Sequence, residues 1–306
     1  MPFWLLCPCG RTKKFNEGVV MNGFGLKCAV VGAVLSALGA NMASTSPLQI
    51  TVDKNHMAIQ NAVDAAGFEI VTSIDHARIA AAEGVEMPPS RVIIFSDPEV
   101  NEPILRENIR TGLDLPFRAL SYAQDGSAQV IFTGSDFLQM RHGLTDISAL
   151  EDFEQKLNGV AENLNAVAAS INGLTRGYGI FELKSKLSVP EAVTNLTEIV
   201  KAQDDTIWFG EIDFPEDPSE KCAKLPKAVL LLFGGPAPGG LAMAGFPAIG
   251  LDAFCQKLLV YAGEDGGSVV IFNDIAALAE LHYGASTKSH HLLNERLTAT
   301  FVKAIQ

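Results

Sequence analysis

The sequence is poor in the residues that mark several common classes of protein. Only 5 of its 306 residues are cysteine, charged residues make up 19%, and 23 Lys and Arg stand against 35 Asp and Glu. The formal net charge of −12 repels a phosphate backbone, so we expect no nucleic-acid binding. A hydrophobic content of 48% is typical of a globular chain rather than a disordered one.

Familiar catalytic and metal-binding motifs are also missing. The chain contains no G-x-S-x-G nucleophile elbow, no H-E-x-x-H metalloprotease motif and no C-x-x-C pair. The glycine-rich run 234–240 lacks the Lys-Ser/Thr of a phosphate-binding loop and holds two prolines, which have no backbone N–H to donate. It predicts a flexible loop instead.

The first 43 residues resemble a targeting segment. The apolar run 28–43 follows Lys27 and ends in small residues, which is typical of a secretory signal, and Met21 is a second candidate start. The run is short for a membrane span of about 20 residues, although an uncleaved membrane anchor is the alternative. We expect an exported protein, periplasmic or extracellular, that does not contact the membrane once the leader is removed.

Removal of this leader would leave two cysteines, Cys222 and Cys255. In an oxidising compartment they could form a disulfide. Two free thiols are the alternative.

The remaining chain contains an internal repeat. Ile74-Asp75 recurs as Ile212-Asp213 and Gly112-Leu113-Asp114 as Gly250-Leu251-Asp252, each at an offset of 138. After two single-residue insertions the offset is 140, and His142 matches His282. One register kept over so many positions indicates duplication. It predicts a first domain over 44–174, a joint over 175–179 and a second domain over 180–306.

Each copy is expected to be an α+β domain with the order strand, helix, four-stranded antiparallel sheet, helix. The expected strands span 48–52, 69–74, 91–95, 115–123 and 129–133 in the first copy, and 181–187, 207–212, 228–233, 258–262 and 268–272 in the second. The expected helices span 56–66 and 147–174, and 190–202 and 292–305. Docking the copies as a pseudo-symmetric pair would bury their open faces, and a homo-oligomer is a further expectation.

These residues resemble a known family. Ile74-Asp75-His76-Ala77, the run 87–95, Gly112-Leu113-Asp114-Leu115-Pro116 and Arg141-His142-Gly143 are similar to motifs of the domain of unknown function 302 family. The resemblance implies a small α+β fold similar to the repeat of the TATA-binding protein, and no established activity. The second copy departs from it, because Phe214 replaces His76 and Leu281 replaces Arg141.

Asp75 and His76 are the first candidate site residues. Adjacent residues on a strand point to opposite faces, so they can cooperate only if a turn intervenes. His76 could bind a metal or carry a proton near neutral pH. Alternatively, Asp75 caps a helix that follows it, and His76 is a surface residue. Asp213 repeats Asp75 without the histidine.

The second group of candidates is the set that the repeat retains. Asp114 and Asp252 are expected to accept backbone hydrogen bonds in a turn. His142 and His282 either bond backbone carbonyls or share a ligand between the copies. The family motif adds Arg141 to this group.

Three functions remain open. The first is a binding or accessory module for a small ligand or metal ion, with a site near Asp75, His76 and His142. The second is an enzyme that uses His76 as acid or base with Asp114 in one cleft. The third is an interaction scaffold, in which the Asp and His side chains lie apart.

Overall fold

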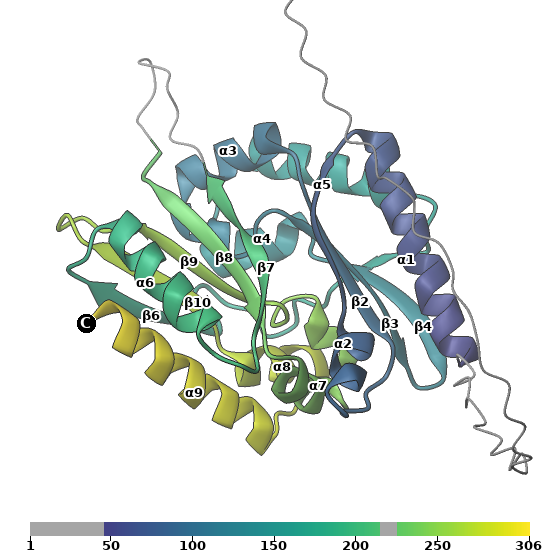
Figure 1. The fold of residues 1–306 in the computed structure, drawn as a ribbon. Coiled ribbons are helices and arrows are strands. Elements are labelled where there is room, and N and C mark those ends of the chain that lie inside the picture. The colour runs from purple at the N-terminus through teal and green to yellow at the C-terminus, as the bar shows by residue number, and fades with distance from the viewer. Residues whose placement is uncertain (1–45, 215–224) are drawn as a thin grey trace, which may run out of the picture. The chain divides into compact units, whose positions relative to one another are not determined.

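The computed structural model describes residues 46–214 and 225–306 as two five-stranded sheets, one in each copy (Figure 1). The first sheet has the order β1 (Glu69–Asp75), β2 (Ser90–Ser96), β3 (Phe117–Gln124), β4 (Ser127–Phe132), β5 (Val167–Ala168). The second has the order β7 (Ile207–Phe214), β8 (Ala228–Gly234), β9 (Gln256–Ala262), β10 (Ser268–Asn273), β6 (Ile180–Ser185). The α+β class and the tandem duplication are confirmed.

Helices connect and cover these strands in a similar order in both copies. The first copy has α1 (Pro47–Ala66), α2 (His76–Ala82), α3 (Pro98–Glu107), the 3-10 helix η1 (Ile109–Leu113), α4 (Ser135–His142) and α5 (Ile147–Ala161). The second has α6 (Val189–Lys201), α7 (Pro236–Met243), the 3-10 helix η2 (Pro247–Gly250), α8 (Ile275–Tyr283) and α9 (Lys288–Ile305). A capping box of Ser188 and Glu191 begins α6.

The strand expected at 48–52 is wrong, because these residues belong to α1. The Ser46 side chain accepts a hydrogen bond from the Gln49 backbone N–H, and Pro47 occupies the first turn, so the helix begins here. The sheet position beside β4 is taken by β5, which runs parallel to it, whereas β6 runs antiparallel to β10. The two copies therefore complete their sheets with different segments.

Two further expectations are corrected. The helix expected over 147–174 ends at Ala161, and Asn165 has a φ of 48°, which turns the chain back to form β5. The loop expected over 234–240 contains the start of α7, whose first turn holds Pro236. A Cβ on Gly240 would lie 2.6 Å from Ala80 Cβ, so the missing side chain lets α7 pack closely on α2.

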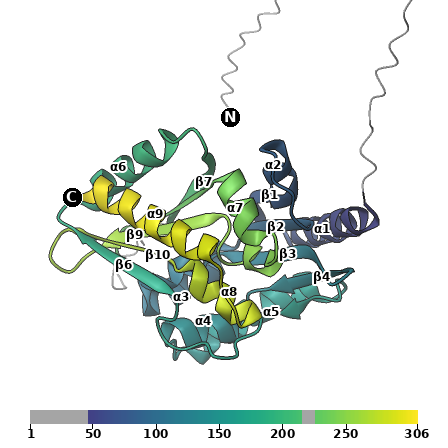
Figure 2. The ribbon, with the colours of Figure 1, turned by 90° about the horizontal axis from the view of Figure 1, so that it is seen from below.

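Each sheet has one face for its own helices and one for the other copy. On β8, Leu231 and Phe233 pack in a cluster with residues of α6 and α9. Leu230 and Leu232, on the opposite face, belong to the core that includes the first copy. Figure 2 shows α6 and α9 beside each other over the second sheet.

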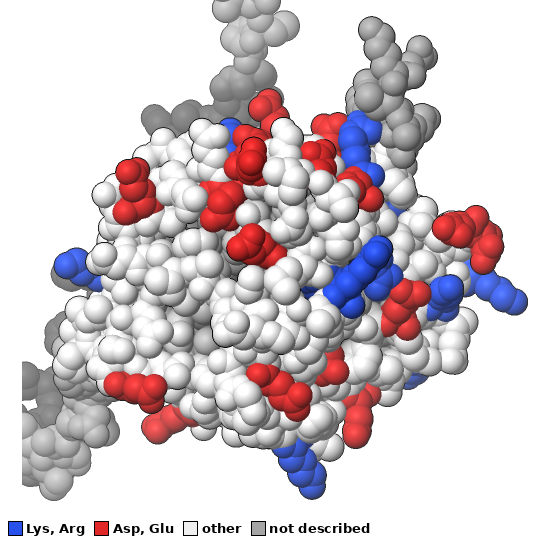
Figure 3. All heavy atoms as spheres, turned by 180° about the vertical axis from the view of Figure 1, so that it is seen from behind, with Lys and Arg blue, Asp and Glu red and all other residues white. Residues whose placement is uncertain are grey.

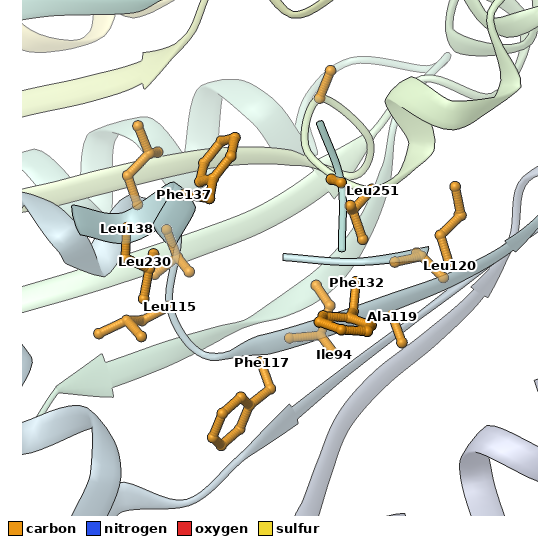
Figure 4. Close-up of a cluster of buried hydrophobic side chains, with 14 of the residues drawn as sticks. Ile94, Leu115, Phe117, Ala119, Leu120, Phe132, Phe137, Leu138, Leu230 and Leu251 are labelled. Carbon is orange, nitrogen blue, oxygen red and sulfur yellow. The ribbon is translucent and has the colours of Figure 1, made fainter. Parts of the chain in front are cut away.

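The core is continuous between the copies. Figure 4 shows Leu230 and Leu251 of the second copy in one cluster with Leu115, Leu120 and Phe132 of the first. These side chains are at most 6% exposed. The two copies therefore share one of the two hydrophobic clusters of the structure.

The glycines of the two Gly-Leu-Asp motifs make reciprocal contacts across this core. A Cβ on Gly112 would lie 2.9 Å from Leu259 of β9, and one on Gly250 would lie 3.2 Å from Leu120 of β3. Leu120 and Leu259 face equivalent partners, Val92 and Leu230, so the two contacts are related by the pseudo-symmetry. These glycines are needed for close approach rather than for the turn that we expected.

Candidate functional site

A buried polar network lies where the two sheet faces meet. Asp114 follows η1 and Asp252 follows η2, and both carboxylates are fully buried. His142 Nε2 lies 2.7 Å from Asp114 Oδ2, and His282 Nε2 lies 2.8 Å from Asp252 Oδ2. Each histidine thus bonds the aspartate of its own copy, and not the backbone carbonyl that is the commoner partner.

Arg118 joins the two halves of this network. Its Nη2 donates to Asp114 Oδ1 at 3.3 Å, to Asp252 Oδ1 at 3.1 Å and to Thr133 Oγ1 at 3.2 Å. The guanidinium is 1% exposed, so water does not weaken these charge-assisted bonds. One side chain of the first copy therefore binds the equivalent aspartates of both copies, Asp114 and Asp252.

Arg141 closes the network on the side of the joint between the copies. Its Nη1 lies 2.8 Å from Asp114 Oδ2, and its Nη2 donates to Asn273 Oδ1 at 2.9 Å. Its Nε and Nη2 also donate to the backbone carbonyls of Tyr178 and Gly179. All five of its N–H groups point at acceptors of the joint or of the network. Leu281 at the equivalent position of the second copy makes none of these bonds, so the site is asymmetric.

Several buried donors in this network have no acceptor. Lys257 Nζ lies 3.8 Å from Asp114 Oδ1, which is too long for a hydrogen bond, and it has no other partner. The Nε and Nη1 atoms of Arg118 are likewise buried and unpaired. An unpaired buried donor costs about 1–3 kcal/mol. This excess of donors is the chemical feature that distinguishes the site.

The charges in the network shift the pKa values of its members. Burial alone would raise the pKa of Asp114, but Arg141, His142 and Arg118 hold it well below its usual range. Asp252 has a pKa of about 2, because His282 and Arg118 outweigh its burial. Burial lowers the pKa of Lys257 to about 7, and Arg118 adds to this effect. The carboxylates stay ionised near neutral pH, while Lys257 can exchange a proton there.

Asp75, His76 and Asp213 lie outside this network. Asp75 caps α2 by accepting from the Arg78 backbone N–H, as the structural alternative predicted. His76 is 6% exposed, not a surface residue, and its ring bonds the Gly250 backbone. Asp213 forms a partly exposed ion pair with Lys227 at 2.7 Å. Among the described residues, His76 and Asp114 share no hydrogen bond, and Asp114 does not line the cavity that His76 lines.

Both copies match one protein-family model. The model describes a domain of unknown function, DUF302, and it matches residues 43–164 and 181–303. The chain belongs to the DUF302 family. The first range contains β1 to β4 and ends before β5, and the second contains the second sheet apart from Ile180. The sequence resemblance is confirmed.

Some curated proteins match a smaller part of this DUF302 protein. "Fluoride-specific ion channel FluC 1" of Brucella suis biovar 1 is 33% identical over 103 residues, which are 31% of this chain and 40% of that protein. A protein of the same name from Brucella abortus biovar 1 is 33% identical over 31% of this chain and 38% of its own length. The chain thus spans about two-fifths of these relatives. Among residues 46–214 and 225–306, no helix is long and apolar enough to span a membrane.

A solved DUF302 structure is also similar. The crystal structure of an uncharacterized conserved DUF302 protein from Bacillus stearothermophilus is 16% identical and covers 42% of this chain and 98% of its own, with a TM-score of 0.35.

The network of this DUF302 pair does not suit a metal cation. Two arginines and Lys257 surround the two carboxylates, and cations this close compete with a metal for the same oxygens. In the part of the chain that the structure describes, no group of three or more His, Cys, Asp and Glu side chains could hold a metal ion. A metal shared by His142 and His282 therefore has no support.

The sequence indicated half of the network and missed the rest. Thr133 and Asn273 are equivalent at the offset of 140, and Arg118 and Lys257 at 139, but none of the four was selected. A signal existed, because Arg118 and Lys257 are single charges within apolar strands. Cys255 is free and 2% exposed, whereas Cys222 lies outside the described residues, so the predicted disulfide stays a prediction.

Proposed function

We propose that this protein is an exported, non-catalytic binding module that holds a small anion in the network between its two copies. The observation that carries the proposal is the excess of buried donors, on Lys257 and Arg118, over acceptors. Such donors reach their lowest free energy when an acceptor with negative charge sits between them.

The dimensions of the network limit the ligand. Lys257 Nζ and the bonded Nη2 of Arg118 lie within 3.8 Å and 3.3 Å of the same oxygen, Asp114 Oδ1, so the unpaired Nε and Nη1 of Arg118 belong to a guanidinium close to Lys257. A ligand that meets both groups must therefore have only one or a few atoms. Arg118, Arg141 and protonated Lys257 exceed Asp114 and Asp252 by one positive charge, which favours a monovalent anion.

Two other features support binding rather than catalysis. The side chains of His142 and His282 are 1% and 5% exposed, which leaves no open cleft for an organic substrate. Figure 3 shows Lys and Arg scattered among Asp and Glu on one face of the molecule, without the basic patch that a nucleic-acid partner would need. The acidic chain that remains after removal of the leader suits a soluble protein in the periplasm or outside the cell.

The test measures stabilisation by anions. Thermal unfolding is followed at pH 6.5 in chloride, nitrate, formate and fluoride, with gluconate as the bulky reference at equal ionic strength. Fluoride is included because of the name of the curated relatives. A saturable rise in Tm is expected for at least one small anion, because a ligand that binds only the folded state stabilises it.

Lys257→Met should remove this rise, whereas the exposed Lys54→Met should keep it. The rise should also weaken above pH 8, where Lys257 is neutral. A Tm that is the same in all anions and gluconate would refute the proposal, as would an equal rise in the Lys257→Met protein.

A further inference from the structure

A second buried site, built from other side chains than the anion network, lies in a narrow cavity between α2 of the first copy and α7 of the second. The cavity has a volume of about 20 Å³, and His76, Met243 and Cys255 all line it. One water-sized sphere occupies about 10–15 Å³, so the cavity admits a single atom or ion rather than an organic molecule.

His76 presents a free nitrogen to this cavity. The ring approaches the backbone of Gly250, while its Nε2 is buried and has no partner among the described residues. A histidine that ligates a metal typically has one N–H held by a carbonyl and the other nitrogen free.

Two sulfur atoms accompany this nitrogen. Cys255 is an unpaired thiol that is 2% exposed, and Met243 is 1% exposed. A Cβ on Gly250 would lie 2.8 Å from Met243 Cε, so the thioether lies beside the residue that His76 bonds. Thiolate, thioether and imidazole form a set that selects soft cations such as Cu(I) over Mg²⁺, Ca²⁺ or Mn²⁺.

From this juxtaposition we propose that His76, Met243 and Cys255 form a site for one Cu(I) ion between the two copies. Binding forms a Cu–S bond as the Cys255 thiol loses its proton to solvent, and the metal is neither oxidised nor reduced. The thiolate and the monovalent cation then carry no net charge into the core, which avoids the cost of a buried charge. The site uses residues that the anion network does not, so either proposal can fail alone.

The test uses the full chain with Cys7, Cys9, Cys28 and Cys222 replaced by Ser, so that Cys255 is its one remaining thiol. Cu(I) is titrated without oxygen against a chromogenic chelator. One equivalent of Cu(I) should bind with release of one proton, and X-ray absorption should show sulfur and nitrogen ligands.

Cys255→Ser and His76→Asn should each weaken Cu(I) binding at least 10-fold, and the volume-conserving Met243→Leu should weaken it less. The control His291→Asn, at an exposed histidine, should leave it unchanged. If Cys255→Ser does not fold, Met243→Leu and His76→Asn decide the question. The proposal would be overturned if the Cys255-only protein bound no Cu(I). It would also be overturned if His76→Asn and Met243→Leu bound Cu(I) as tightly as that protein does.

Discussion

Arg118 and Lys257 occupy the same position in the two sheets. Arg118 lies opposite Ile94 and Lys257 lies opposite Leu232, and both side chains point into the space between the copies. Arg118 reaches both aspartates, whereas the shorter Lys257 approaches only Asp114, at 3.8 Å. The duplication thus supplies two cations at one site, and the divergence of one of them leaves a donor unpaired.

Lys257→Met should stabilise the protein, because it replaces a buried, unpaired amine with an apolar side chain of similar volume. The expected gain is about 1–3 kcal/mol in the free energy of unfolding at pH 6.5, measured with urea in gluconate buffer. Lys54→Met serves as the exposed control and should change it by less than about 0.5 kcal/mol.

The gain should depend on pH. The pKa of Lys257 is about 7 in the folded protein and about 10.5 in the unfolded chain, so the unfolded chain binds more protons between these values. The wild-type protein therefore becomes more stable as pH rises from 7 to 10.5, and the advantage of the variant shrinks over the same range. Parallel stability curves for the two proteins would show that Lys257 titrates normally.

Gly112→Ala and Gly250→Ala should both weaken the contact between the copies. The added Cβ atom would lie 2.9 Å from Leu259 Cδ1 of the second copy at Gly112, and 3.2 Å from Leu120 Cδ1 of the first copy at Gly250, so these leucines would have to shift in a closely packed core. We expect a loss of about 1–3 kcal/mol for each substitution, measured by urea unfolding.

Gly159→Ala is the matched control, since a Cβ there meets nothing within 4 Å. It should stabilise α5 by about 0.5–1 kcal/mol. A loss at Gly159 equal to the loss at Gly112 would mean that close packing is not the cause.

The repeat made the sheets predictable from sequence. Apolar runs bounded by turns give β2, β3, β8 and β9, and Asp125-Gly126, a dipeptide typical of hairpins, forms the turn between β3 and β4 with φ values of 51° and 77°. The prediction of a strand over 48–52 was wrong. The β-branched residues there are typical of a strand, but the cap at Ser46 and the 20-residue helical pattern favour α1. The helix at 147–174 failed because an apolar periodicity can continue beyond a helix end.

The site was only partly predictable for a different reason. Asp114, His142 and their equivalents are identical in the two copies, so the repeat alone selects them. Arg118 and Lys257 differ in type and lie between two insertions, which hides their equivalence. That the aspartates of both copies meet one arginine depends on how the sheets pack, and no local pattern reports that.

Acid should destabilise the protein through two buried histidines. Burial lowers the pKa values of His56 and His76 to about 4, against 6.5 in the unfolded chain. Between these values the unfolded chain binds more protons, so stability falls as pH decreases from 6.5 to 4, by about 3 kcal/mol for each histidine.

His56→Asn and His76→Asn should each reduce this pH dependence in urea unfolding of the metal-free protein. The exposed His291→Asn should retain the wild-type slope. If none of the three substitutions alters the slope, the acid sensitivity has another origin.

Arg141→Leu places in the first copy the residue that the second has at Leu281. The side chain of Arg141 is fully buried, and its loss would remove one donor each from Asp114, the Tyr178 and Gly179 carbonyls and Asn273. We expect a loss of about 3–5 kcal/mol in the free energy of unfolding, because one partner of a buried ion pair is removed.

The matched control is Arg296→Leu, which breaks the ion pair with Asp205 at 2.6 Å. Both of its side chains are more than 40% exposed, so its loss should cost at most about 1 kcal/mol. If Arg141→Leu lowers the free energy of unfolding no more than Arg296→Leu does, a leucine at this position, as at Leu281 in the second copy, costs little stability. A larger loss at Arg141 would show that its bonds to the joint and to the network stabilise the protein, which a leucine at this position cannot do.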